Sequence, residues 1–222
     1  MITTPVIKFE GRQHAATLLA ERLFPYRNTD AVVVAIPNGG IPVGYHLAKQ
    51  LQLPLVAMAC KKIQHPGDPS KTIGSVSSDE IVMHEVGQDI PQDYIYHQIM
   101  MAQRSMKAED ERCNQPGPLT CLKDKTVILA DDFLKTGDTM LACLKAAQKQ
   151  QPGKIIIAVP VATPEAINAF AGKVDEIVYL ISEPGLAQVS KWFDEFPQVA
   201  ESEVSLLMDK ARKELNSSTE LS

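Results

Sequence analysis

The sequence predicts an α/β fold, built on a doubly wound, mainly parallel sheet with helices on both faces. Apolar segments of strand length alternate with segments of helical periodicity between residues 31 and 181. Such alternation favours right-handed βαβ units, in which the parallel strands are buried on both sides. The composition, 45% hydrophobic and 22% charged, agrees with a water-soluble globular domain of this kind.

Five buried strands and their helices follow from the pattern. The helix starts show Pro or Gly just before or inside the first turn, as in Ile41-Pro42 and Thr163-Pro164. A helix from Gly11 to Pro25 is expected to lie against the sheet at the start of the chain, and another from 201 to 215 near its end. The predicted strands are residues 31–36, 53–60, 126–130, 154–160 and 175–181.

A flap is expected to interrupt this alternation. Residues 61–70 combine two prolines, a glycine and polar residues, which predicts a loop, and 73–82 supply one or two short strands. Residues 91–113 have helical spacing and should pack outside the sheet or against another subunit. We therefore expect a single domain over 1–215, with a mobile loop and β-flap at 61–90, a hood-like aromatic segment at 182–200 and a frayed tail at 216–222.

Length, charge and cysteine content exclude several classes of protein. At 222 residues with net charge −5, the chain is the size of one domain and lacks the bulk positive charge of many nucleic-acid-binding proteins. No apolar run approaches the roughly 18 residues of a membrane span, and no export signal is recognisable. The four cysteines form no Cys-x-x-Cys pair, which argues against zinc and favours reduced, mostly buried thiols in a cytoplasmic protein.

The most informative segment follows the strand 126–130. Two acids, Asp131 and Asp132, precede a Thr-Gly-x-Thr turn that leads into a helix. Unpaired amides at a helix N-terminus suit a phosphate, Thr136 and Thr139 add hydroxyl donors, and Gly137 allows close approach. The acids would repel that phosphate unless they face ribose hydroxyls or a hard cation. The pattern thus favours a phosphorylated sugar, against the alternative of a solvated loop and a simple helix cap.

This segment resembles the phosphoribosyl-pyrophosphate (PRPP) signature of type I phosphoribosyltransferases: an apolar strand, two acids, two apolar residues, one variable residue, then Thr-Gly-x-Thr. The resemblance implies that Asp131 and Asp132 hold the ribose and Mg²⁺, directly or through water. It also implies a 5′-phosphate cradle made of Lys135, Thr136, Gly137, Asp138 and Thr139. Asp138 adds a negative charge inside this turn, so we expect its side chain to point outward.

Two other segments are expected to serve the same pocket. After the strand 31–36, the loop Asn38-Gly39-Gly40 allows successive N–H groups to converge on an anion, and in the family this loop binds pyrophosphate. Asn38 stands where close relatives carry arginine. Lys61 and Lys62 are expected to assist pyrophosphate departure, with His65 as a weaker candidate; a solvated lysine pair is the alternative.

The aromatic segment is the candidate for acceptor binding. Trp192 and Phe193 either stack on a flat base or cap the core, and the sequence leaves both open. From residue 9 to 208 the chain resembles a subgroup of phosphoribosyltransferases whose substrate is unassigned. Arg12 is ordinarily a surface charge, although the family leader also tends to carry an arginine there.

The resemblance implies an enzyme that uses PRPP and Mg²⁺ to transfer phosphoribosyl to a nitrogenous base or related acceptor with release of pyrophosphate. It also implies a homodimer, while the charge, hydropathy and cysteine content predict a cytoplasmic protein that has no nucleic-acid or membrane partner. The alternative is a regulatory protein that senses PRPP or nucleotides on the same fold. A dinucleotide-dependent oxidoreductase is disfavoured because no Gly-x-Gly-x-x-Gly follows the first strand.

Overall fold

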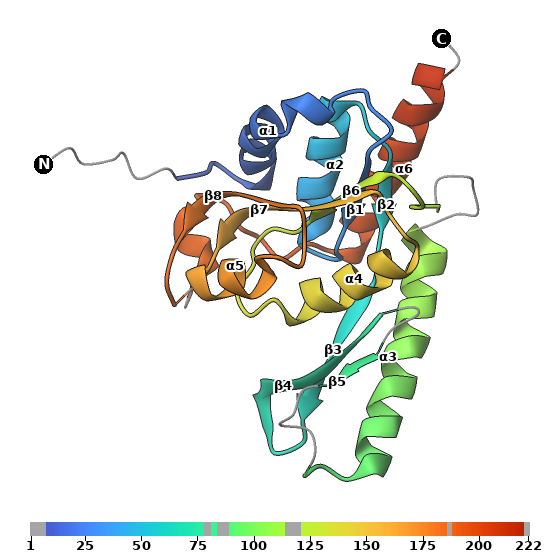
Figure 1. Ribbon diagram of the computed structural model, residues 1–222, viewed down its shortest axis with the longest axis vertical. Coiled ribbons are helices and arrows are strands. Elements are labelled where there is room, and N and C mark those ends of the chain that lie inside the picture. The colour runs from blue at the N-terminus through green and yellow to red at the C-terminus, as the bar shows by residue number, and fades with distance from the viewer. Residues whose placement is uncertain (1–7, 78–80, 84–88, 114–120, 186–187, 220–222) are drawn as a thin grey trace, which may run out of the picture.

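The structure of the chain is a computed structural model that describes residues 8–77, 81–83, 89–113, 121–185 and 188–219 (Figure 1). Its centre is a five-stranded sheet with the order β2-β1-β6-β7-β8, in which every neighbouring pair is parallel. The predicted fold class is confirmed. The strands are β1 (Val32–Ala35), β2 (Leu55–Ala57), β6 (Thr126–Ala130), β7 (Lys154–Ala162) and β8 (Glu176–Ser182).

Helices cover both faces of this sheet. One face carries α1 (Arg12–Arg22), α2 (Gly40–Leu51) and α6 (Glu201–Thr219), and the other carries α4 (Asp138–Lys149) and α5 (Pro164–Phe170). Alternate residues of each strand enter the two cores because side chains of a strand point to opposite sides. The helix α6 continues to Thr219, beyond the expected end at 215.

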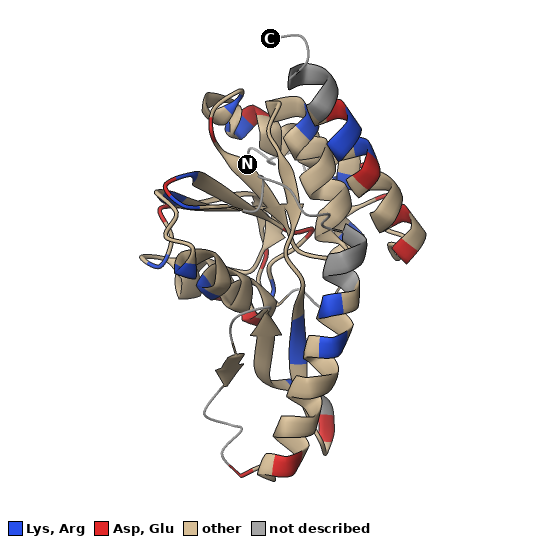
Figure 2. Cartoon of the chain, turned by 90° about the vertical axis from the view of Figure 1, so that its right-hand side faces the viewer, with Lys and Arg blue, Asp and Glu red and all other residues tan. Residues whose placement is uncertain are grey.

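Charges on the outer helices are mixed. Both acidic and basic side chains occur along α6, with Glu201 and Glu203 in its first turn and the basic residues further on (Figure 2). No helix within the described ranges is both long enough and apolar enough to cross a membrane.

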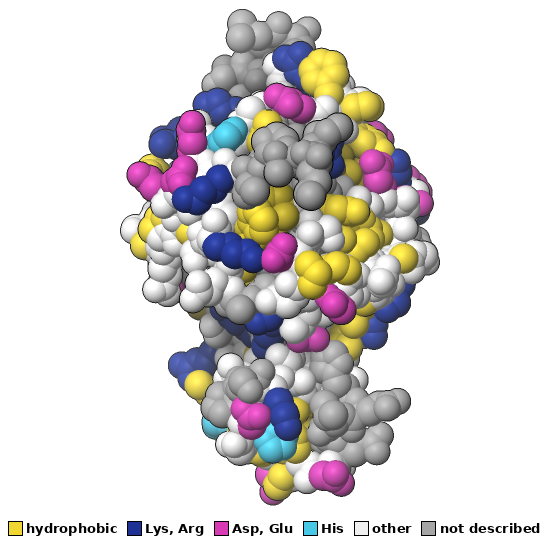
Figure 3. All heavy atoms as spheres, turned by 90° about the vertical axis from the view of Figure 1, so that its left-hand side faces the viewer, with side chains coloured by type: hydrophobic (Ala, Val, Ile, Leu, Met, Phe, Trp, Pro, Cys, Tyr) yellow, Lys and Arg dark blue, Asp and Glu magenta, His cyan; other side chains and the backbone are white. Residues whose placement is uncertain are grey.

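A smaller layer, here called the flap, lies beneath the main sheet. It consists of the antiparallel strands β3 (Cys60–His65), β4 (Asp68–Ser77) and β5 (Ile81–Met83), covered by α3 (Gln92–Cys113). Seen from another side, it forms a narrower lower lobe under the broad sheet layer (Figure 3). Two short 3₁₀ turns, η1 (Phe24–Tyr26) and η4 (Val189–Trp192), complete the described elements.

The flap corrects one expectation from the sequence. Residues 61–70 are not a loop, because β3 and β4 pair as a hairpin across the Pro66-Gly67 turn. The polar composition was misleading because a single apolar residue of this segment fixes the hairpin through distant contacts: Ile63 packs in one cluster with Ile73 of β4 and Met106 of α3. The predicted strand 53–60 is accordingly split between β2 in the main sheet and β3 in the flap.

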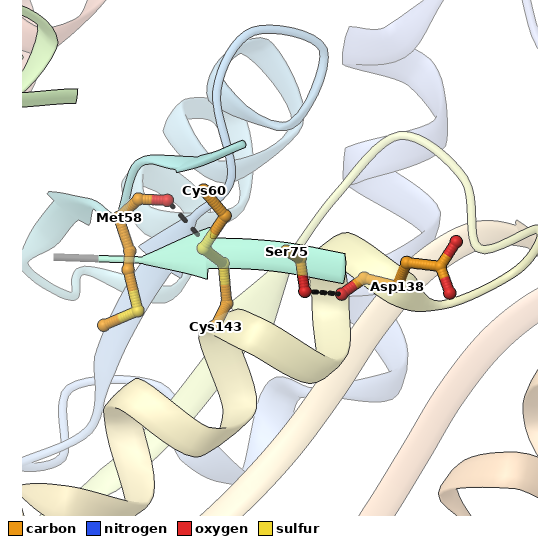
Figure 4. Close-up of a disulfide and its surroundings, with 5 residues drawn as sticks. All are labelled: Met58, Cys60, Ser75, Asp138 and Cys143. Atoms are coloured by element: carbon orange, nitrogen blue, oxygen red, sulfur yellow. Dashed lines mark hydrogen bonds between the residues drawn. A yellow bond between two sulfur atoms is a disulfide. The ribbon is translucent and has the colours of Figure 1, made fainter. Parts of the chain in front are cut away.

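A second correction concerns the cysteines. Cys60 at the start of β3 and Cys143 on α4 form a disulfide, whereas the sequence predicted reduced thiols (Figure 4). The sequence could not show this pairing because the two residues are 83 positions apart and meet only when the flap packs on α4. Cys121 is free and exposed.

Candidate active site

The two glycine-containing loops meet at the centre of the sheet. The strands β1 and β6 are neighbours, with Ala35 beside Ala130, and their following helices lie on opposite faces. This reversal creates a crevice at the carboxyl ends of the strands, where ligands of such folds bind. A Cβ atom on Gly39 would lie 2.1 Å from Oδ2 of Asp132, and one on Gly40 would lie 2.7 Å from the carbonyl of Ala130. Only glycines allow the loops to approach this closely.

A pocket of about 460 Å³ opens at this crevice. Its walls are residues 36–39, the acid pair with Phe133, and the segment 196–199, which we call the rim; Arg12 and Thr139 complete the lining. The structure therefore brings together the predicted pyrophosphate loop and the predicted sugar-binding acids. The Pro37–Asn38 peptide in this wall is cis.

The two carboxylates have different surroundings. Burial raises the pKa of Asp131 well above its usual range, and the neighbouring charge of Asp132 adds to the shift. Burial also raises the pKa of Asp132, but the guanidinium of Arg12 opposes that shift. Of the two carboxylates, Asp132 is therefore the one whose negative charge the protein itself stabilises. The amide of Asp132 donates to Oδ1 of Asp131 at 2.8 Å, which fixes the orientation of that carboxyl.

Arg12 is a residue of the site whose place the sequence analysis did not fix. Its Nε and Nη2 atoms both lie 2.9 Å from Oδ2 of Asp132, and the two side chains are 10% and 5% exposed. The arginine of the family leader was the one available signal. Periodicity could not reveal the contact, because Arg12 occupies the first turn of α1 and its partner lies 120 positions later.

The turn between β6 and α4 is fixed by a glycine conformation and by a side-chain hydrogen bond. Gly137 adopts φ +80°, a conformation that favours glycine, and a Cβ atom there would lie 2.5 Å from the Phe170 ring. The hydroxyl of Thr163 donates to the carbonyl of Lys135 at 2.8 Å and accepts from the amide of Ala166, so one side chain fixes the turn and caps α5.

The side chain of Asp138 was expected to point away from this turn, but it lies beside the turn. The Thr136 hydroxyl donates to its carboxylate at 2.8 Å, Nζ of Lys62 lies 3.8 Å away, and the side chain is 18% exposed. Its backbone carbonyl also accepts from Ser75 of β4 (Figure 4). The lysine balances the negative charge, which lets the carboxylate stay beside the turn.

The flap brings one of the two predicted lysines to the site. Adjacent residues of a strand face opposite sides, so Lys62 faces α4 and Lys61 does not. His65 lies at the hairpin end, where its Nδ1 accepts from the amide of Gly67 at 3.0 Å. Lys135 is exposed on the turn.

The aromatic segment is only partly as expected. Phe193 is 3% exposed, and its ring lies 5.1 Å from that of Phe9, so it caps the core and does not line the pocket. Trp192 packs in the same cluster, and its indole nitrogen is buried without a hydrogen-bond partner among the described residues. Phe196, three residues after Phe193, lines the pocket instead. The spacing of aromatic residues in this loop does not indicate which ring enters the core and which lines the pocket.

Metal binding here would depend on the ligand as well as the protein. No group of three or more His, Cys, Asp or Glu side chains suited to a metal occurs within the described ranges. Mg²⁺ commonly binds through one or two carboxylates, several waters and substrate phosphates. The pair Asp131–Asp132 at the pocket wall fits that donor set.

Comparison with known proteins places this geometry in a family. A profile of the phosphoribosyl transferase domain matches residues 9–181. A Mycobacterium tuberculosis protein, provisionally named a phosphoribosyl transferase, is 27% identical over 213 residues, and the match covers 93% of this chain and 47% of that protein. The same match occurs in a second strain. The chain thus spans about half the length of these relatives.

A solved structure has the same fold. The crystal structure of the protein TT1426 from Thermus thermophilus superposes with a TM-score of 0.77 at 29% identity, covering 91% of this chain and 98% of that one. At this coverage the likeness extends over most of the chain, and it agrees with the fold class predicted from the sequence.

Proposed function

Because the chain belongs to the phosphoribosyl transferase family, we propose that it transfers the phosphoribosyl group of PRPP to a nitrogenous acceptor and releases pyrophosphate. The observation that carries this proposal is the meeting of two loops at one crevice. The acid pair lies directly against the Gly39-Gly40 loop, and Thr139 at the end of the Gly137 turn lines the same pocket. Sugar, 5′-phosphate and pyrophosphate could then be held by adjoining parts of one pocket.

The proposed reaction is a substitution at the anomeric carbon. The bond from this carbon to the pyrophosphate oxygen breaks, and its electron pair leaves with pyrophosphate. The lone pair of an acceptor nitrogen forms the new bond, and the acceptor proton passes to solvent. Since a polyanion departs, the protein must neutralise negative charge more than it must supply a strong base.

Each wall has a proposed role in this step. Asp131 orients the ribose hydroxyls, the Asn38-Gly39 part of the loop receives the pyrophosphate, and the turn 135–139 holds the 5′-phosphate. The amide of Gly40 donates to the carbonyl of Ile36 at 3.0 Å, so this amide takes no part in the proposed anion binding. Lys62 approaches the turn 135–139 from the flap. Asp131 would hold Mg²⁺, directly or through water, and the cation would supply positive charge to neutralise the departing pyrophosphate.

The flap and the rim would exclude water from this reaction. The flap touches the phosphate turn through Lys62 and Ser75. We propose that residues 1–215 act as one domain in which 61–90 and 182–200 cover the pocket on two sides. A homodimer and a cytoplasmic location are proposed on the family resemblance alone, and sedimentation would test the former.

One observation favours the sensor as a second candidate. Asp138 engages Thr136, which belongs to the proposed 5′-phosphate cradle, and Lys62, which is the lysine proposed to assist pyrophosphate departure. Asn38 adds no charge to the pyrophosphate loop. A protein with this arrangement could bind a nucleotide without turnover and regulate a partner.

A screen for pyrophosphate release distinguishes the two candidates. Purified chain, PRPP and Mg²⁺ are incubated with single purine, pyrimidine and other nitrogenous acceptors, and pyrophosphate is measured. Release that depends on one acceptor class and is lost in Asp131→Asn supports the transferase. PRPP binding without release on any acceptor supports the sensor, and no binding at all removes both.

A further inference from the structure

Arg12 joins three parts of the pocket through one side chain. Besides its two contacts with Asp132, its Nη1 atom donates to the carbonyl of Pro197 at 2.8 Å. Its guanidinium carbon lies 3.8 Å from the centre of the Phe196 ring, a cation–π contact. The start of α1, the acid pair and the rim are thereby held in one arrangement. Planar, forked donors make arginine suited to this task, and lysine cannot replace it.

These contacts make the acid pair asymmetric. Asp132 is paired with an internal cation, whereas no ion pair to Asp131 is present among the residues that the structure describes. The charge of Asp132 is therefore already compensated before any ligand arrives. Asp131 is the carboxylate left to face a sugar or a cation, and it lies against the glycine loop, 3.2 Å from where a Cβ atom of Gly40 would be.

We propose that Arg12 is a positioning residue that assigns different roles to the two carboxylates and couples the sugar end of the pocket to its rim. By compensating Asp132 from within, it leaves Asp131 as the carboxyl group that meets the ligand and its cation. By binding Pro197 and covering Phe196, it fixes the rim against the acids. The inference rests on the proposed function for the identity of the ligand, but not for the asymmetry itself.

The rim contact also limits how an acceptor could be recognised. Arg12 covers one face of the Phe196 ring, and the ring of Phe193 lies 4.6 Å away at a tilt of 33°. A base would find little of this ring free for stacking. Recognition at the rim would then fall to the main chain of 197–199 and to the exposed side chain of Gln198.

Titration with Mg²⁺ alone tests the charge assignment without any reaction. Calorimetry on the full chain compares the wild type with Arg12→Met, Asp132→Asn and Arg12→Met/Asp132→Asn. We expect Arg12→Met to bind Mg²⁺ about tenfold more tightly, because two uncompensated carboxylates then face the cation. Asp132→Asn should bind it more weakly, because Arg12 loses its partner, and the double variant should return to the wild-type affinity.

The matched control is Arg22→Met at the other end of α1. Arg22 also donates to a main-chain carbonyl, that of Tyr179, but it is exposed and lies outside the pocket. Its variant should bind Mg²⁺ as the wild type does. Unchanged affinity in Arg12→Met, or a double variant that does not return to the wild-type value, would overturn the proposal. If Arg12→Met fails to fold, Asp132→Asn and the neutral double variant still give the comparison.

A second titration, with PRPP and Mg²⁺ together, tests the coupling to the rim. Arg12→Met should weaken PRPP binding about tenfold, because the extra negative charge faces a polyanion. The double variant should recover only part of this loss, because the contacts of Arg12 with Pro197 and Phe196 remain absent. Full recovery would overturn the coupling. Absence of PRPP binding in the wild type would refute the proposed function, while the Mg²⁺ series would still decide the role of Arg12.

Discussion

The two walls of the pocket are built by different means. The turn after β6 is held by backbone geometry: Gly137 at φ +80°, the Thr163 hydroxyl on the Lys135 carbonyl, and a disulfide on the helix that follows. The aromatic wall is held by ring packing, with Phe193 inside the core and Phe196 under Arg12. Changes in the first wall should therefore affect both stability and binding, whereas those in the second should chiefly affect stability.

The largest effect is expected in the aromatic wall. Phe193→Ala removes a ring that is 3% exposed, and should lower the free energy of unfolding by about 3–5 kcal/mol. Phe196→Ala should cost less, because that ring is only partly buried. Urea unfolding of both variants measures the difference. Equal losses would show that Phe193 does not anchor the wall.

The disulfide between the flap and α4 should contribute nearly as much to the free energy of unfolding. Reduction of Cys60–Cys143 should lower the free energy of unfolding by about 2–4 kcal/mol, because the unfolded chain loses a long covalent loop. Cys121→Ser, at an exposed free thiol, serves as the control and should leave stability unchanged. Peptide mapping of unreduced protein that recovers Cys60 and Cys143 unlinked would contradict this prediction.

A comparison of two glycines with the same backbone conformation tests the turn that is proposed to hold the 5′-phosphate. Gly137 and Gly172 adopt φ +80° and +77°, but only a side chain at Gly137 would collide with Phe170. Gly172→Ala should cost about 1–2 kcal/mol from backbone strain alone. Gly137→Ala should cost more and also weaken PRPP binding about tenfold. Equal stability in the two variants, with PRPP binding retained in both, would argue against a tight turn at Gly137.

The smallest effect is a pH dependence of the ligand-free protein. The pKa of Asp131 is raised, so between the usual carboxyl range and the raised value the folded state holds a proton that the unfolded chain has released. Stability should therefore fall as pH rises through that interval, by up to about 1.4 kcal/mol per pH unit. Asp131→Asn should flatten this slope and be more stable at neutral pH.

Urea unfolding across a pH series provides the measurement. Asp209→Asn is the control, since that carboxylate is 59% exposed on α6 and should leave the slope unchanged. A slope that persists in Asp131→Asn would assign the titration to another group.

The sequence predicted those parts of the fold that depend on local pattern. The five core strands follow from apolar runs, although residues 53–60 are divided between two sheets. The strand order that sets the two glycine loops side by side was not predicted from local pattern, and only the family resemblance placed the loops at one pocket. The start of α5 was predicted, because Thr163 caps it and Pro164 occupies its first turn.

What the sequence could not predict depends on contacts between distant segments. The pairing of Arg12 with Asp132, and of Cys60 with Cys143, joins residues 120 and 83 positions apart. The hairpin at 60–77 owes its stability to apolar side chains of α3, and the choice of Phe196 over Phe193 depends on which ring reaches the core. No local pattern contains this information.

Calorimetric titration of PRPP with and without Mg²⁺, on the wild type and on Asp131→Asn, tests the central claim most directly. We expect binding that strengthens with Mg²⁺ in the wild type and falls at least about tenfold in Asp131→Asn, because the crevice between β1 and β6 holds the ribose against this carboxylate. Equal PRPP affinity in the two proteins would show that the sugar phosphate does not bind at this carboxylate.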